Sequence, residues 1–85
     1  MRVIWKYPIQ IINTQKIRMP KGAEVLSVGI DPDNQPCVWC SVDPYQSEEY
    51  RTIHVVDTGE GVPDNTVFVG TFIYHSYVGH IFIEK

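Results

Sequence analysis

The stretch from Met19 to Pro44, MPKGAEVLSVGIDPDNQPCVWCSVDP, decides the predicted fold. It holds two turn-forming segments, MPKG and DPDNQP, and each is followed by an apolar run of strand length. Proline presets φ at the second position of a turn, and glycine permits a tight reversal. Asp43-Pro44 ends the second run, because proline lacks an amide proton and constrains the residue before it. We therefore predict a β-hairpin against which the remaining strands pack.

Alternation along this hairpin predicts which side chains are buried, because successive residues of a strand point to opposite faces. The apolar residues that share one face are expected in the core: Leu26, Val28 and Ile30 in the first strand, and Val38, Cys40 and Val42 in the second. Trp39 then lies on the opposite face, where its ring is available to a partner.

The rest of the chain shows the same period of two. Further strands are predicted within residues 3–7, 15–19, 50–56, 66–75 and 80–84. Residues 76–79 are expected to turn the chain back before the last strand, and residues 45–49 to form a polar connection with room for one helical turn. No segment repeats apolar residues at the helical period over three turns. The sequence predicts one all-β domain, residues 1–85, folded as a small antiparallel β-sandwich or barrel of about six to seven strands.

The composition narrows the class of protein. The formal net charge of −3 argues against direct binding of nucleic acid by electrostatic attraction. Two cysteines are too few for the disulfide framework of a small secreted module. The first residues lack the apolar stretch of a signal peptide, and no run is long enough to span a bilayer. We therefore expect a cytoplasmic protein without a membrane partner.

Small size and aromatic content favour an interface. A chain of 85 residues buries a limited core, and chains of this kind are often supplemented by oligomerisation. Residues 67–73 are apolar on both faces of the predicted strand. One face suits the core, so the other needs cover from a second sheet or from a partner subunit. We therefore expect a homo-oligomer.

Two patterns suggest metal chemistry without establishing it. Cys37 and Cys40 form a C-x-x-C motif, but positions three apart on a strand face opposite sides, so we expect no shared metal and no disulfide. His75 and His80 flank the predicted last turn, and facing each other across a hairpin they remain a possible two-histidine metal site. His54 is the one other histidine. We expect neither a metal nor another cofactor.

Two segments are candidates for ligand binding. The loop Thr58-Gly59-Glu60-Gly61 has two glycines, whose exposed backbone amides suit an anion-binding nest. It lacks the third glycine of a dinucleotide fingerprint and the Gly-Lys-Ser/Thr of a Walker loop, and an ordinary hairpin-type loop is the alternative. Lys16, Arg18 and Lys21 form a small basic patch that suits a phosphate or an acidic partner. A solvated strand face that blocks aggregation is the alternative for this patch.

Catalysis finds little support in the sequence. Ser41, His54 and Asp43 can be assembled into a triad on paper, but no nucleophile elbow or other local context accompanies them. Asp57 and Glu60 are two carboxylates in a loop, where such groups are usually solvated. We therefore predict that the protein is not an enzyme.

Five segments carry a resemblance to known proteins: Trp5-Lys6-Tyr7-Pro8-Ile9, Met19-Pro20-Lys21-Gly22-Ala23, Val38-Trp39-Cys40, Asp57-Thr58-Gly59 and Gly79-His80-Ile81-Phe82-Ile83-Glu84. Together they resemble a family of short, mostly uncharacterised phage and prophage proteins. Members of that family usually carry a glycine before the Thr-Gly and often a histidine after it, where this chain has Asp57 and Glu60. The resemblance implies a phage accessory protein, and small proteins of this kind frequently counter host defence.

We therefore expect a non-catalytic anti-defence protein of the host cytoplasm, which sequesters a host immune protein or a nucleotide-type immune signal. A self-associating structural or assembly component of a phage particle is the alternative. For a nucleotide, Trp39 or Tyr77 would stack on the base, and cationic side chains and the glycine loop would take the phosphates. The residues predicted to bind are Lys16, Arg18, Trp39, Arg51, Thr58, Gly59, Gly61 and Tyr77.

Overall fold

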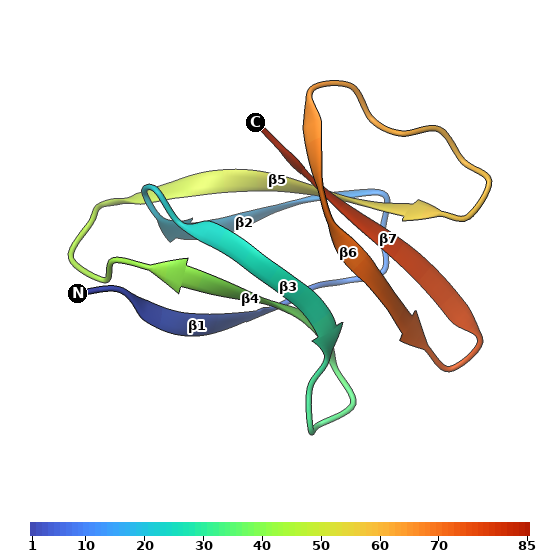
Figure 1. The fold of residues 1–85 in the computed structure, drawn as a ribbon, viewed down its shortest axis with the longest axis horizontal. Helices are drawn as coiled ribbons and strands as arrows, with labels where there is room; N and C mark the ends of the chain where they lie inside the picture. Colours follow the sequence, from blue (N-terminus) through green and yellow to red (C-terminus); the bar gives the residue numbers. More distant parts are fainter.

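The computed structural model describes residues 1–85 and contains seven strands and no helix. The strands are β1 (Val3–Pro8), β2 (Thr14–Pro20), β3 (Glu24–Ile30), β4 (Pro36–Val42), β5 (Glu48–Asp57), β6 (Thr66–Tyr74) and β7 (Tyr77–Glu84). Every strand pair is antiparallel. The predicted all-β antiparallel fold is confirmed, and it takes the form of a sandwich of two sheets (Figure 1). No helix could cross a membrane, since none is long and apolar enough.

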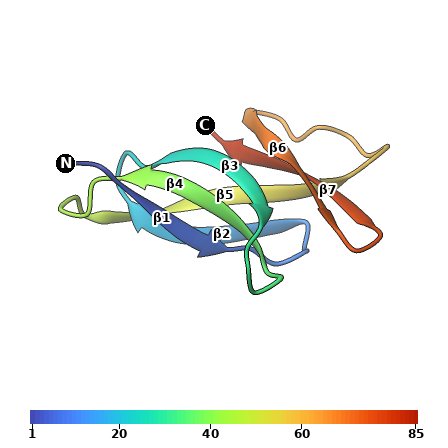
Figure 2. The ribbon, with the colours of Figure 1, turned by 60° about the horizontal axis from the view of Figure 1, so that its bottom comes forward.

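The two sheets differ in size and are linked by repeated crossings of the chain. Sheet A has the order β1-β4-β3, and sheet B has the order β2-β5-β7-β6 (Figure 2). The chain passes from one sheet to the other after β1, after β2 and after β4. The result is a flat molecule of 39 × 32 × 16 Å.

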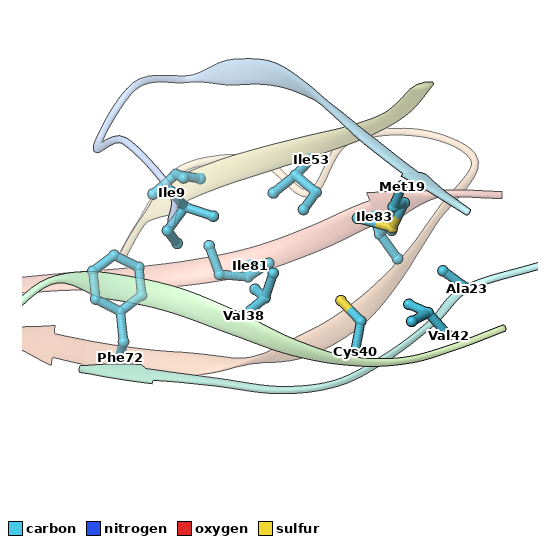
Figure 3. Close-up of a cluster of buried hydrophobic side chains, with 11 residues drawn as sticks. Ile9, Met19, Ala23, Val38, Cys40, Val42, Ile53, Phe72, Ile81 and Ile83 are labelled. Carbon is cyan, nitrogen blue, oxygen red and sulfur yellow. The ribbon is translucent and has the colours of Figure 1, made fainter. Parts of the chain in front are cut away.

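The core fills the space between the sheets (Figure 3). Its buried side chains are Ile9, Met19, Ala23, Val38, Cys40, Val42, Ile53, Val55, Phe72, Ile81 and Ile83. The predicted burial of Val38, Cys40 and Val42 is confirmed, because none of the three has any exposed surface. Ile9 enters from the β1–β2 connection, where its N–H donates to Pro36 O at 3.0 Å.

A β-bulge corrects the predicted core face of β3. Val25 pairs with Cys40 and Ser27 pairs with Trp39, so the register shifts at Leu26. Leu26 is therefore 48% exposed, whereas Val25 packs against the core. The extra residue of a bulge interrupts the alternation of side chains, which a strict period of two does not anticipate.

The β6–β7 hairpin is tighter than predicted. Its turn consists of residues 75–76 instead of 76–79, and His75 adopts φ 56° there. His80 pairs with Thr71, so His75 and His80 do not face each other and the possible two-histidine site is wrong. Residues 44–45 form a turn before β5, and residues 45–49 contain no helical turn.

The sandwich is closed along one side and open along the other. On the closed side β3 packs against β6, so tightly that a Cβ atom on Gly70 would lie 3.0 Å from Val28 Cγ1. On the open side β1 ends sheet A and β2 ends sheet B, and each pairs with a single neighbour. The open side therefore presents two strand edges without a strand partner.

Candidate functional site

The eight residues predicted to bind a ligand do not form one site. They are distributed over four places: β2 on the outer face of sheet B (Lys16, Arg18), the inner face of sheet B (Arg51, Tyr77), the outer face of sheet A (Trp39), and the loop between β5 and β6 (Thr58, Gly59, Gly61). The outer face of a sheet is here the face that points away from the core. The eight residues therefore belong to four separate surfaces.

Lys16 and Arg18 keep their exposed positions, but Arg51 does not join them. Arg18 Nε lies 3.8 Å from Glu48 Oε1, and Lys16 makes no ion pair. Arg51 lies on the neighbouring strand β5 and points to the inner face of sheet B. Its Nη1 donates to Ala23 O at 2.8 Å. The Arg51 guanidinium therefore links β5 to the β2–β3 turn instead of extending the basic patch.

Trp39 stands alone on sheet A. It is half-buried, lies between Lys6 and Ser27 in the strand register, and covers Gly29. A Cβ atom at Gly29 would lie 3.1 Å from Trp39 Cζ3, so the indole rests on the glycine backbone. Lys6 is itself paired with Asp31 at 2.8 Å. The Trp39 ring is thus largely occupied by contacts within its own sheet.

The loop of residues 58–65 places Thr58 on the outer face of sheet B. Thr58 Oγ1 shares a hydrogen bond of 2.7 Å with His80 Nε2. The Glu60 N–H donates to Asp57 O at 3.1 Å, which closes a turn, and Gly59 within it has φ 96°. The second glycine, Gly61, is exposed. The Glu60 amide is therefore already paired and is not free to receive an anion.

Tyr77 lies on the inner side of the same sheet. Its ring packs against Phe72 with centroids 5.9 Å apart, and its OH donates to Asp57 Oδ1 at 2.6 Å. Burial, and then this hydrogen bond, raise the pKa of Tyr77 to about 12. Tyr77 thus anchors the base of the loop, and its ring is not presented beside Thr58.

Beside the loop the structure presents an aromatic surface that alternation did not single out. Phe68 of β6 and Phe82 of β7 face each other on the outer face of sheet B, with centroids 5.4 Å apart and ring planes at 57°. We call this pair the aromatic platform. Phe68 is 55% exposed. A shallow hollow of about 180 Å³ lies over the platform and is walled by the loop residues Thr58, Gly59 and Val62.

His80 forms the polar floor beside the platform. Its Nε2 shares a hydrogen bond with Thr58, and its Nδ1 shares one of 2.8 Å with Thr71 Oγ1. A neutral imidazole has one donor and one acceptor nitrogen, so both are satisfied by the two hydroxyl groups. His80 therefore ties Thr58, the first residue of the loop, to Thr71 of β6 on the outer face of sheet B.

The charges around the platform are negative. Asp57 and Glu60 line the hollow, and no Lys or Arg does. The Asp57 carboxylate accepts from Tyr77 on the inner side of the sheet, so Glu60 supplies the acidic side chain of the hollow. A hollow with an acidic side chain and no cation suits an apolar or aromatic group better than a phosphate.

The family model of the Domain of unknown function (DUF7352) matches residues 1–85. The chain belongs to this family. No curated protein and no solved structure matches it.

A second polar cluster ties three strands of sheet B together. His54 Nδ1 shares a hydrogen bond of 3.2 Å with Thr14 Oγ1, and His54 Nε2 lies 2.8 Å from Glu84 Oε2. The three residues come from β5, β2 and β7. A hydroxyl, an imidazole and a carboxylate are thus connected, but the hydroxyl belongs to the first residue of a strand and not to a strained turn of the kind that exposes a nucleophile. The cluster adds side-chain links between strands that are already paired through their backbones.

Sequence reasoning missed the aromatic platform for a definable reason. Residues 67–73 stood out as apolar on both faces, which was the available signal. The register shift between Phe68 and Gly70 decides which of these side chains face outward. Phe82 becomes the neighbour of Phe68 because β6 pairs with β7. The register of that pairing depends on the length of the hairpin turn.

Proposed function

We propose that the protein is a non-catalytic phage accessory protein that acts against host defence by binding a host immune protein in the host cytoplasm. The observation that carries the proposal is the aromatic platform of Phe68, which is 55% exposed, and Phe82, beside a loop whose first residue is hydrogen-bonded to His80. Exposed contiguous apolar surfaces rimmed by polar residues mark protein interaction sites. The phage context rests on the sequence resemblance described above.

A protein partner agrees better with the charges than a nucleotide-type immune signal does. The hollow over the aromatic platform is lined by Glu60 and by no cation, whereas the cations Lys16 and Arg18 project from β2, at the far end of sheet B from β6. A nucleotide needs an aromatic contact and cationic groups within one ligand length. Phe68 and the two cations lie on the first and last strands of sheet B, and Arg51 and Tyr77 face inward.

Affinity capture from a defence-competent bacterial lysate, with platform variants, tests the proposal. We expect the wild-type chain to retain a specific protein that Phe68→Ser fails to retain. Tyr45→Ser is the matched control, because Tyr45 is 92% exposed in the β4–β5 connection, away from the platform. Capture of the same protein by Phe68→Ser, or of none by the wild type, would contradict the proposal. A nucleotide found by native mass spectrometry would replace the protein partner with the nucleotide alternative.

A structural or assembly protein is the second candidate, favoured by one observation. β6 contains no charged residue, and Val67, Phe68 and Ile73 of this strand are all at least half exposed. Such a surface also suits self-association into a homo-oligomer. Light scattering after size exclusion measures the subunit number, and detection of the chain in purified virions would favour this candidate.

A further inference from the structure

The β2 edge of sheet B has backbone groups without a strand partner. The Val55 N–H donates to Asn13 O at 3.1 Å, so residues 13 and 55 form a hydrogen-bonded pair. Pairs in an antiparallel ladder alternate between hydrogen-bonded and non-hydrogen-bonded. The backbone N–H and C=O groups of Thr14, Lys16 and Arg18 therefore point away from β5, toward the open side of the sandwich.

A groove runs beside this edge, between β2 and β1. Its volume is about 580 Å³, the largest on the molecule. Tyr7 and Ile17 supply apolar surface, and the glutamines Gln10, Gln15 and Gln35 supply amides. The only charged residues that line it are Lys16 and Arg18, and it has no carboxylate. The protein as a whole is acidic, with a net charge of −3, so this cationic groove stands out against the rest of the surface.

Charge decides which occupant fits. A second copy paired antiparallel along β2 would bring Lys16 and Arg18 opposite the same cations of its partner on one face, and such like-charge pairs are destabilising. An acidic strand would instead place carboxylates beside Lys16, which has no ion-pair partner, and beside Arg18, whose contact with Glu48 is long at 3.8 Å. The intervening side chains of that strand would point into the groove toward Tyr7 and Ile17.

We propose that the β2 edge binds an extended acidic segment of a partner protein by β-strand addition, with Asp or Glu at alternate positions and apolar residues between them. The backbone of Thr14, Lys16 and Arg18 supplies the ladder, and the groove supplies side-chain selection. This site lies on the open side of the sandwich and is separate from the aromatic platform. The inference holds whether or not the platform binds a partner.

A capped eight-residue peptide that alternates Glu and Val tests the inference, at neutral pH and low salt, by titration into ¹⁵N-labelled protein. We expect chemical-shift changes along β2, and slower amide exchange for Thr14, Lys16 and Arg18, whose N–H groups gain acceptors. The same peptide methylated on alternate backbone nitrogens keeps its charge but loses one hydrogen-bonding edge, and it should not protect these amides.

Two charge-reversal variants complete the test. Lys16→Glu combined with Arg18→Glu should weaken binding about tenfold or more and should favour a peptide that alternates Lys and Val. Lys21→Glu is the matched control, since Lys21 is exposed in the β2–β3 turn and does not line the groove, so its effect should be about twofold or less. Absence of binding, binding without protection of the three amides, or equal binding by the methylated peptide would overturn the inference. Equal affinity for an oligonucleotide of the same charge would also overturn it.

Discussion

The ring of Phe72 lies directly on the backbone of Gly79, across the β6–β7 ladder. The two residues are paired in register, and a Cβ atom at Gly79 would lie 2.6 Å from Phe72 Cε1. Phe72 is 2% exposed and Gly79 is also buried, so neither can move aside without disturbing the core. The absence of a side chain at position 79 thus allows the Phe72 ring to lie against the backbone of β7.

Replacing this glycine should be costly. We expect Gly79→Ala to lower the free energy of unfolding by about 1–3 kcal/mol, because overpacking forces a buried ring out of place. Gly61→Ala is the control, since nothing lies within 4 Å of a Cβ there, and it should change stability by less than about 0.5 kcal/mol. Urea denaturation followed by tryptophan fluorescence measures both. Equal stability of the two variants would contradict the packing argument.

The Lys6–Asp31 pair should make the free energy of unfolding decrease at acid pH. The Lys6 ammonium, 2.8 Å away, and the N–H groups of Gln35 and Asp33 hold the pKa of Asp31 below its usual value. A carboxyl whose pKa is lower in the folded state stabilises the fold above its unfolded pKa, about 3.9, and this contribution is lost as pH falls below that value.

The corresponding experiment compares Asp31→Asn with the wild type at pH 7 and at pH 3. The variant should be less stable at pH 7, and its loss of stability on acidification should be smaller. Asp64→Asn, in the exposed 58–65 loop, is the matched control and should follow the wild type. If the wild type and Asp31→Asn lose equal stability between the two pH values, the pair does not contribute in this way.

Tyrosine ionisation should separate Tyr77 from the exposed tyrosines. Burial and the hydrogen bond to Asp57 raise the pKa of Tyr77 to about 12. Ultraviolet titration should show one phenol ionising near that value, and Tyr77→Phe should remove it. Asp57→Asn should lower it, because the carboxylate charge disfavours the phenolate. Since the pKa is raised in the folded state, the stabilisation is full below the unfolded value of about 10 and is lost as pH rises from there toward 12. An unchanged titration curve in Tyr77→Phe would refute the assignment.

Both thiols should be inert in the native protein. Cys37 and Cys40 are free and have no exposed surface, and burial raises the pKa of Cys40 to about 11 and also raises that of Cys37. The thiolate is the reactive form, so Ellman's reagent at pH 8 should find no fast-reacting thiol until denaturant is added, when two should react. Rapid labelling of either cysteine in the native state would count against the structure of β4.

The positions of strands and turns follow from local residue patterns. Proline and glycine at 20–22 turn the chain from β2 into β3, and the cluster of turn formers at 31–36 sets the β3–β4 hairpin, because these residues restrict φ and ψ locally. The same local rule placed Val38, Cys40 and Val42 together on the core face of β4. It also separated Cys37 from Cys40, which indeed meet different neighbours: Pro8 and Gly29 for Cys37, and Trp5 and Val25 for Cys40.

The candidate site was less accessible to sequence reasoning. The exposed 58–65 loop and the cations of β2 could be selected by residue type. Their distance from one another, and the inward direction of Arg51 and Tyr77, depend on which strands are neighbours. Residue chemistry alone therefore groups these residues around one ligand, whereas the fold distributes them over both faces of sheet B and the outer face of sheet A.

The sequence by itself determined an all-β chain, the hairpin at its centre and most of the core of β4, because a period of two and turn chemistry are local properties of the backbone. The tertiary structure decided the bulge that exposes Leu26, the pairing that brings Phe68 to Phe82 and the open edge at β2. These features depend on hydrogen bonds and packing between residues far apart in the chain. A shift of one residue in such pairing turns a side chain from the core to the solvent.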